Sequence, residues 1–452
     1  MAGREGPYRR DYNRTNYIHP NEENLWDLHK AMDYNAAGQP LLRVNGQFSG
    51  ASVDAFNRLR VSNPSTIFDS QQMHVESNRF TTEIFGGASK TYLPNESSVA
   101  MTVNTAINDE VIRQSKIVMP YQPGKSLLIL NTFVFNTPKP GLRQRVGYFD
   151  SRNGVYLEND GVTNYLVIRS YATGSIVERR IAQADWNVDK FDGTGKSANA
   201  TDRGLNSPTL DVSKTNIMWM DIEWLGVGDV RIGFIVDGAP MIAHIFHNDN
   251  RNTTVYMTTA CLPLRYEIKN VTAQSASSTM KQICASVVSE GGYNLQGVIH
   301  GCGRGFTIAS ATDLGNAGTE VPLIAFRLRE NRNHSIVIPS AFRMYVDSNA
   351  TINYRVWMGA DVTGGTWEYR PTNSSVEYNV GITGATYTNA ELVQGGFVTG
   401  GAAIVAGTGN IDNLNYQLQY WNDNTRPIIL LTAIGTSNNI KTLSKAEWIE
   451  LI

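Results

Sequence analysis

The sequence has few charged side chains and no long apolar run. Asp, Glu, Lys and Arg make up 18% of its 452 residues, against about 25% in an average soluble domain. The net charge of −2 lacks the basic surplus of a general nucleic-acid-binding protein. No apolar stretch approaches the ~18 residues of a membrane span, and the polar start Met1–Glu5 lacks the apolar core of a signal peptide. We therefore expect neither nucleic acid nor a membrane as a partner.

Cysteine is also scarce. Cys261, Cys284 and Cys302 give neither an even disulfide framework nor a CxxC pair of metal ligands. We expect free thiols and synthesis in a reducing cytosol.

Asparagine and glycine are abundant instead, with 41 Asn and 40 Gly. Both residues tolerate the positive φ angles of tight turns. Together with 41% hydrophobic residues, this composition predicts many strands joined by many turns and little long helix.

The strongest strand signals lie in residues 66–293. Leu127–Phe135 is apolar and β-branched, and Asn164–Tyr171 alternates between apolar and polar residues. A three-strand meander follows over 217–246, with a tight hairpin turn at Asp237-Gly238. Short antiparallel strands at this spacing predict a β-sandwich or jelly-roll domain over 66–293.

Residues 1–65 lack such a pattern and predict an extended N-terminal arm, with a short helix at 22–33. A flexible leader is the alternative interpretation. Aromatic and arginine side chains are the candidate partner-binding groups of the arm: Arg9, Arg10, Tyr12, Tyr17, Trp26, Phe56, Arg58 and Arg60.

Residues 294–452 predict a second β-rich domain, which starts after the glycine-rich segments 291–293 and 301–305. Ser444 and Glu447 match a helix capping box and predict a short terminal helix. The segment 395–407 is apolar but has almost no bulky side chains, which favours packing around the symmetry axis of a homo-oligomer. A trimer is our preferred state, and a buried strand and turn is the alternative for this segment.

No motif forms a complete catalytic constellation. Gly124-Lys125-Ser126 and Gly195-Lys196-Ser197 lack the upstream glycine of a phosphate-binding loop. His244, His247 and Asp249 could hold a metal, but they are more typical of a polar turn at a strand end.

Two further candidates are a carboxylate pair and a thiol. Asp221 and Glu223 share one strand face, as paired carboxylates of a glycosidase could, although a solvated face is the simpler interpretation. Cys302 lies between two glycines without an evident activating partner, which indicates an inert thiol. Trp186 and Tyr387 are the candidate exposed aromatics for binding a glycan.

Several phrases of the chain resemble virion structural proteins of tailed bacteriophages, notably those of cyanobacterial phages. The phrase DIEWLGVGDVRIGFIVDG at Asp221–Gly238 carries this resemblance most clearly. Others follow the family in the same order: Asp54–Ser70, Asp192–Gly195 with Leu210-Asp211, Leu262–Ile268 and Ser289–Tyr293. The resemblance covers residues 54–293, and residues 196–209 depart from it as an enlarged loop.

The resemblance implies a particle component without enzyme activity or cofactor. We therefore expect a virion protein, assembled in the host cytoplasm, that binds other capsid, neck or tail proteins. It would be a homo-oligomeric decoration, fibre or spike anchored through residues 1–65. The alternatives are a receptor- or glycan-binding tail adhesin that recognises a host surface glycan, and a polysaccharide-degrading tail protein.

Overall fold

The computed structural model describes residues 32–34, 40–42, 63–194, 208–294, 296–347, 349–400, 404–407, 417–421 and 425–451. Contacts divide the chain into two units, Met1–Val61 and Ser62–Ile452. Within the described ranges, no helix is long and apolar enough to span a membrane. These ranges contain strands and short 3-10 turns but no α-helix, which confirms the mainly β fold class predicted from composition.

The first unit contains one described hairpin. Strands β1 (Met32–Tyr34) and β2 (Pro40–Leu42) pair in antiparallel fashion. The predicted helix at 22–33 is therefore wrong at Met32 and Asp33, and its other positions lie outside the described residues. Every candidate partner-binding residue of the arm also lies outside the described residues: Arg9, Arg10, Tyr12, Tyr17, Trp26, Phe56, Arg58 and Arg60.

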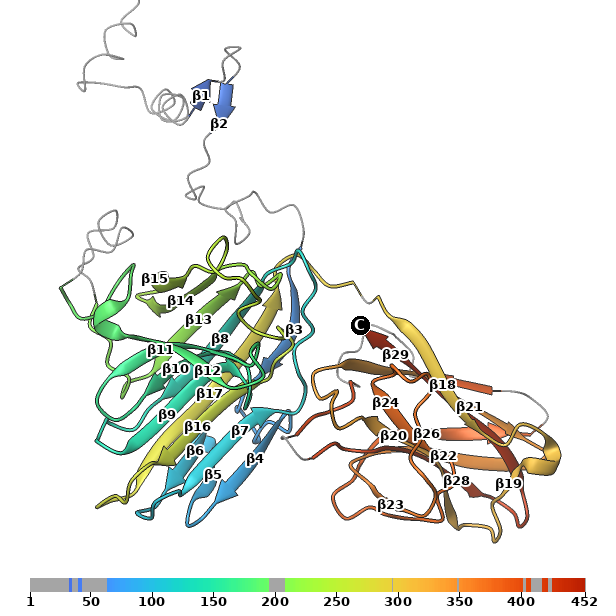
Figure 1. Cartoon of the computed structure of the whole chain (residues 1–452). Helices are drawn as coiled ribbons and strands as arrows, with labels where there is room; N and C mark the ends of the chain where they lie inside the picture. The colour runs from blue at the N-terminus through green and yellow to red at the C-terminus, as the bar shows by residue number, and fades with distance from the viewer. Residues whose placement is uncertain are drawn as a thin grey trace, which may run out of the picture. The chain divides into compact units, whose positions relative to one another are not determined.

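Strands between 65 and 289 form the two sheets of an antiparallel sandwich, drawn blue to yellow in Figure 1. The seven-stranded sheet has the order β12 (Val177–Ala182), β11 (Asn164–Ser170), β10 (Gly154–Asn159), β9 (Leu142–Phe149), β16 (Leu264–Asn270), β7 (Glu110–Ser115) and β4 (Phe80–Phe85). The eight-stranded sheet has the order β15 (Ala239–Phe246), β14 (Val230–Val236), β13 (Asn216–Ile222), β8 (Leu127–Val134), β17 (Ser278–Ser289), β6 (Ser98–Val103) and β5 (Ser89–Leu93), with β3 (Ser65–Ser70) paired to β17.

Strict alternation builds the core of this first sandwich. In β8 every second side chain is buried, because successive residues of a strand point to opposite faces. Leu127, Ile129 and Phe133 of β8 accordingly join the core cluster. The predicted meander is confirmed by β13, β14 and β15, and both Asp237 (φ 50°) and Gly238 (φ 77°) adopt the positive angles that its tight turn requires.

Strands from 298 onward form the sheets of a second antiparallel sandwich, orange to red in Figure 1. One sheet has the order β18 (Val298–Arg304), β29 (Lys441–Leu451), β21 (Ile336–Val346) and β27 (Ile404–Gly407), with β19 (Thr312–Asp313) beside β29. The other has the order β24 (Val376–Asn379), β20 (Glu320–Leu328), β28 (Ile429–Gly435), β22 (Thr351–Met358) and β26 (Glu391–Thr399); β23 (Asp361–Thr363) and β25 (Gly384–Thr386) pair separately.

The predicted terminal helix is wrong. Ser444 and Glu447 belong to β29, which lies between β18 and β21. Thr442, Ser444, Ala446 and Trp448 are buried at every second position, so this segment follows the period of a strand. Backbone pairing on both sides outweighs the local helix signal, because it satisfies the amides and carbonyls along the segment.

Candidate functional site

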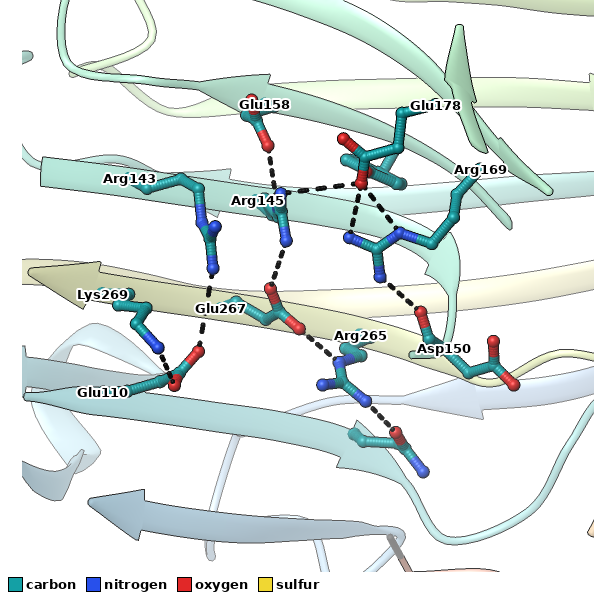
Figure 2. Close-up of polar contacts among 12 residues, drawn as sticks. Glu110, Arg143, Arg145, Asp150, Glu158, Arg169, Glu178, Arg265, Glu267 and Lys269 are labelled. Atoms are coloured by element: carbon teal, nitrogen blue, oxygen red, sulfur yellow. Dashed lines mark hydrogen bonds and ion pairs between the residues drawn. The ribbon is translucent and has the colours of Figure 1, made fainter. Parts of the chain in front are cut away.

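Charged side chains cover the outer face of the seven-stranded sheet. In β16, Arg265, Glu267 and Lys269 alternate with residues that join the sandwich core. Strand pairing places Glu267 opposite Arg145 of β9, and Arg145 opposite Glu158 of β10. The register thus lines up a carboxylate, a guanidinium and a second carboxylate across three neighbouring strands (Figure 2).

Ion pairs hold this row together. Nε of Arg145 donates to Glu158 at 2.5 Å, and its Nη1 lies 3.4 Å from Oε2 of Glu267. Nε of Arg265 donates to Oε1 of Glu267 at 2.6 Å. Both Glu158 (2% exposed) and Glu267 (3% exposed) are buried. Burial alone would raise the pKa of Glu267, but the guanidinium groups of Arg265 and Arg145 lower it to about 2.

A second branch of the same network contains a buried tyrosine. Glu178 of β12 accepts hydrogen bonds from Arg169 at 3.0 Å and from the hydroxyl of Tyr156 at 2.8 Å. Arg169 also donates to the carbonyl of Asp150 at 2.7 Å (Figure 2). Tyr156 packs against Phe149 with ring centroids 4.4 Å apart, so aromatic and ionic contacts share this face.

This arrangement opposes acid–base chemistry on the sheet face. A general acid needs a pKa near the working pH, and Glu267 is held far below it. Arg145 also fills the space between the two carboxylates, where a glycosidic oxygen would have to lie. The network therefore fixes the strands of the sheet to one another.

The other carboxylate pair is also neutralised by arginine. Asp221 (8% exposed) and Glu223 (7% exposed) are both buried, so the interpretation of a solvated strand face is wrong. Arg231 of the neighbouring strand lies 3.3 Å from Asp221 and 3.0 Å from Glu223. The strand pairing brings Arg231 opposite Asp221, a relation that the pattern of β13 alone does not show.

The two histidines have separate roles. Nδ1 of His244 accepts from the backbone amide of Asn187 at 3.1 Å, and burial lowers the pKa of His244 to about 4. His247 instead contacts Asp229 at 2.7 Å. The described part of the chain holds no cluster of three or more His, Cys, Asp or Glu suited to a metal.

The candidate glycan-binding aromatics are packed against protein. Trp186 is 2% exposed and stacks on Phe234 at 6.2 Å, so its predicted exposure is wrong. Tyr387 is half-buried and packs on Trp357 at 4.9 Å.

The remaining motifs have structural surroundings. Cys302 is buried, and this burial raises the pKa of its thiol to about 12, which fits an inert cysteine. Ser126 of the first GKS phrase lies directly before β8, and its hydroxyl donates a hydrogen bond to the carboxylate of Glu290. The second phrase, 195–197, lies outside the described residues.

The second sandwich contains a cavity of about 660 Å³ that sequence reasoning missed. Its wall includes Gly301 and Gly303 of the edge strand β18, together with residues of β21, β24 and β29. A Cβ at Gly301 would lie 2.7 Å from the carbonyl oxygen of Ala446, so glycine permits this close strand approach. The alternating glycines at 301–305 are the only signal of this cavity in the sequence, and they equally suit the domain boundary predicted there.

Aromatic and charged side chains face this cavity. Phe306 and Tyr378 supply rings, whereas Arg343, Arg370 and Lys445 supply cations. Phe306 is 86% exposed, which is unusual for a phenylalanine. Its backbone amide donates to Ser310 at 3.0 Å, and a capping box joins Thr307 to Ser310, so the loop that presents the ring is fixed.

Comparisons with protein families and with curated proteins find no match to this chain. Among solved structures, a protein of unknown function from Shewanella oneidensis MR-1 is 10% identical, with a TM-score of 0.33, over 62% of this chain and 98% of its own. Peanut lectin is 11% identical, with a TM-score of 0.30, over 50% and 98%. The CBM2 module of the evolved Dit of Lactobacillus casei BL23 phage J-1 is 6% identical, with a TM-score of 0.31, over 50% and 96%. Likenesses of this strength carry no argument about the function of the chain.

Proposed function

We propose that this chain is a non-enzymatic structural component of a tailed-bacteriophage particle. The observation that carries the non-enzymatic part of the proposal is the row Glu158–Arg145–Glu267, in which buried carboxylates are fixed by guanidinium groups. Such a row joins three strands, and the side chain of Arg145 occupies the space between the two carboxylates. The ordered phrases over residues 54–293 support a particle component on independent grounds.

The polysaccharide-degrading alternative is disfavoured by Asp221 and Glu223. One guanidinium, that of Arg231, contacts both carboxylates. A glycosidase needs room for the glycosidic oxygen between its two carboxyl groups, and here the guanidinium of Arg231 lies against both of them.

Attachment through residues 1–65 and a homotrimeric state complete this proposal. Phe397 in the edge strand β26 is 68% exposed, and it belongs to the segment 395–407 expected at a symmetry axis. A closed oligomer would cover this side chain on each copy at once.

Truncation tests the attachment. A chain that lacks residues 1–50 should keep the melting temperature of the remaining body and fail to join particles when it is supplied to a deletion phage. The full chain supplied in the same way is the control. Full incorporation of the truncated chain would refute attachment through the arm, and absence of the intact chain from purified particles would refute the particle role.

A further inference from the structure

We propose that the cavity beside β18 binds an acidic oligosaccharide, with Arg370 at the sugar carboxylate and Phe306 against a sugar ring. This inference does not depend on where the protein sits in a particle. The cavity volume of about 660 Å³ lies within the ~300–1,000 Å³ range of small-molecule sites, and it suits a short oligosaccharide.

Two of the three cations at the cavity already have a close carboxylate partner. Glu447 of β29 contacts Arg343 at 2.9 Å and Lys445 at 2.6 Å. Its carboxylate therefore compensates part of the positive charge of these two cations.

Arg370 differs from these two cations. Its side chain is 80% exposed and lies 3.7 Å from Glu368, whose side chain is 49% exposed. Exposed ion pairs of this length are weak. The planar guanidinium can therefore turn to a ligand, and its paired N–H groups match the two oxygens of a carboxylate.

Phe306 explains why the ligand should be a sugar and not a simple anion. Its ring is exposed on a loop fixed by the hydrogen bond to Ser310. An exposed aromatic ring can pack against the C–H face of a pyranose, and the fixed backbone of its loop reduces the freedom that is lost on binding. Tyr378, on the same cavity wall, adds a phenol that can hydrogen-bond a sugar hydroxyl.

The test uses the full chain and isothermal titration calorimetry with α-1,4-linked trigalacturonic acid. Its methyl ester is the matched neutral probe, because it keeps the shape and removes the charge. We expect the acid to bind at least about tenfold more tightly than the ester, and its affinity to fall as salt is raised.

Variants assign the contacts. Arg370→Glu and Phe306→Ala should each weaken binding of the acid by at least about tenfold, and Arg370→Lys should weaken it less than Arg370→Glu. Arg332→Ala and Phe85→Ala change exposed side chains outside the cavity lining and should leave binding unchanged. Melting curves establish that each variant is folded.

Equal affinity for acid and ester would overturn the assignment of charge. Failure of the acid to bind, or unchanged binding by folded Arg370→Glu, would overturn the site. A fall in oligomeric mass on Phe306→Ala, without uronate binding by the parent chain, would identify a second copy as the occupant and also overturn it. None of these outcomes bears on particle incorporation, so the two proposals fail separately.

Discussion

Arg145 and Glu267 lie directly opposite each other on neighbouring strands, with their charged groups 3.4 Å apart, although 122 residues separate them in the chain. Glu158 occupies the corresponding position on the other side of Arg145. One guanidinium therefore compensates two buried carboxylates, and its removal leaves both without this partner.

Replacement of Arg145 should be strongly destabilising. Arg145→Met removes a guanidinium shared by two buried carboxylates and leaves each with one arginine partner, Arg265 for Glu267 and Arg180 for Glu158. We expect the free energy of unfolding to fall by up to about 3–5 kcal/mol, the cost of breaking a buried ion pair. Lys269→Met on the same face is the control, because the side chains of Lys269 (25% exposed) and Glu110 (14% exposed) are less buried than those of Arg145 (9% exposed) and Glu158 (2% exposed), and ion pairs contribute less as they become more exposed. Denaturant unfolding measures both, and similar losses would contradict the role of Arg145.

Acid should weaken the first sandwich through Glu267. Its pKa is lowered from 4.5 to about 2 in the folded chain, so the unfolded chain takes up the proton more readily. The stabilisation is present above pH 4.5 and is lost as the pH falls from 4.5 towards 2. Melting temperatures across this window should fall less steeply for Glu267→Gln than for the parent chain. Parallel curves would exclude Glu267 as a source of the acid sensitivity.

Trp448 should be a central residue of the second core. It is 0% exposed, stacks on Phe326 with centroids 5.4 Å apart and donates from Nε1 to Glu450 at 2.9 Å. Trp448→Ala should cost about 3–5 kcal/mol. Trp367→Ala, at a half-buried ring under Arg327, should cost less, as chemical unfolding of both variants will reveal. An unchanged midpoint for Trp448→Ala would contradict this packing.

The isolated protein should be a homotrimer. Light scattering at micromolar concentration should give three times the 49.9 kDa of one chain, and Phe397→Glu should reduce this mass by placing charge at a covered apolar contact. Val162→Glu, at a residue that is 75% exposed in the first sandwich, is the control. A single-chain mass for the parent protein would refute oligomerisation, whereas twice the chain mass would refute only the trimer.

Local sequence determined some elements well and others poorly. The β13–β15 meander was predictable because Asp-Gly is a typical sequence of a tight hairpin turn, and Asp237 and Gly238 both adopt the positive φ angles of such a turn. Strand β29 was not, because Ser444 and Glu447 imitate a helix cap, and small or polar residues such as Thr442 and Ser444 conceal the buried face.

Contacts between segments that are distant in the chain could not be predicted from local sequence patterns. Arg145, Glu158 and Glu267 meet only because β10, β9 and β16 are neighbours, and that order depends on the pairing of the whole sheet. The cavity beside β18 likewise needs segments near 301, 343, 370 and 445 to converge. The spacing of these residues along the chain therefore predicts neither the ion-pair row nor the cavity.

The central place of β29 has a consequence for biosynthesis. Strands β18 and β21 both pair with β29. During synthesis, their backbone amides and carbonyls that face β29 therefore lack these partners until residues 441–451 have left the ribosome. Every strand of the two sheets of the first sandwich has been synthesised once β17 is complete, so these sheets can pair while translation continues. A premature stop shortly before residue 441 would thus release a chain with one finished sandwich and one set of exposed strand edges, the kind of surface that recruits chaperones or aggregates.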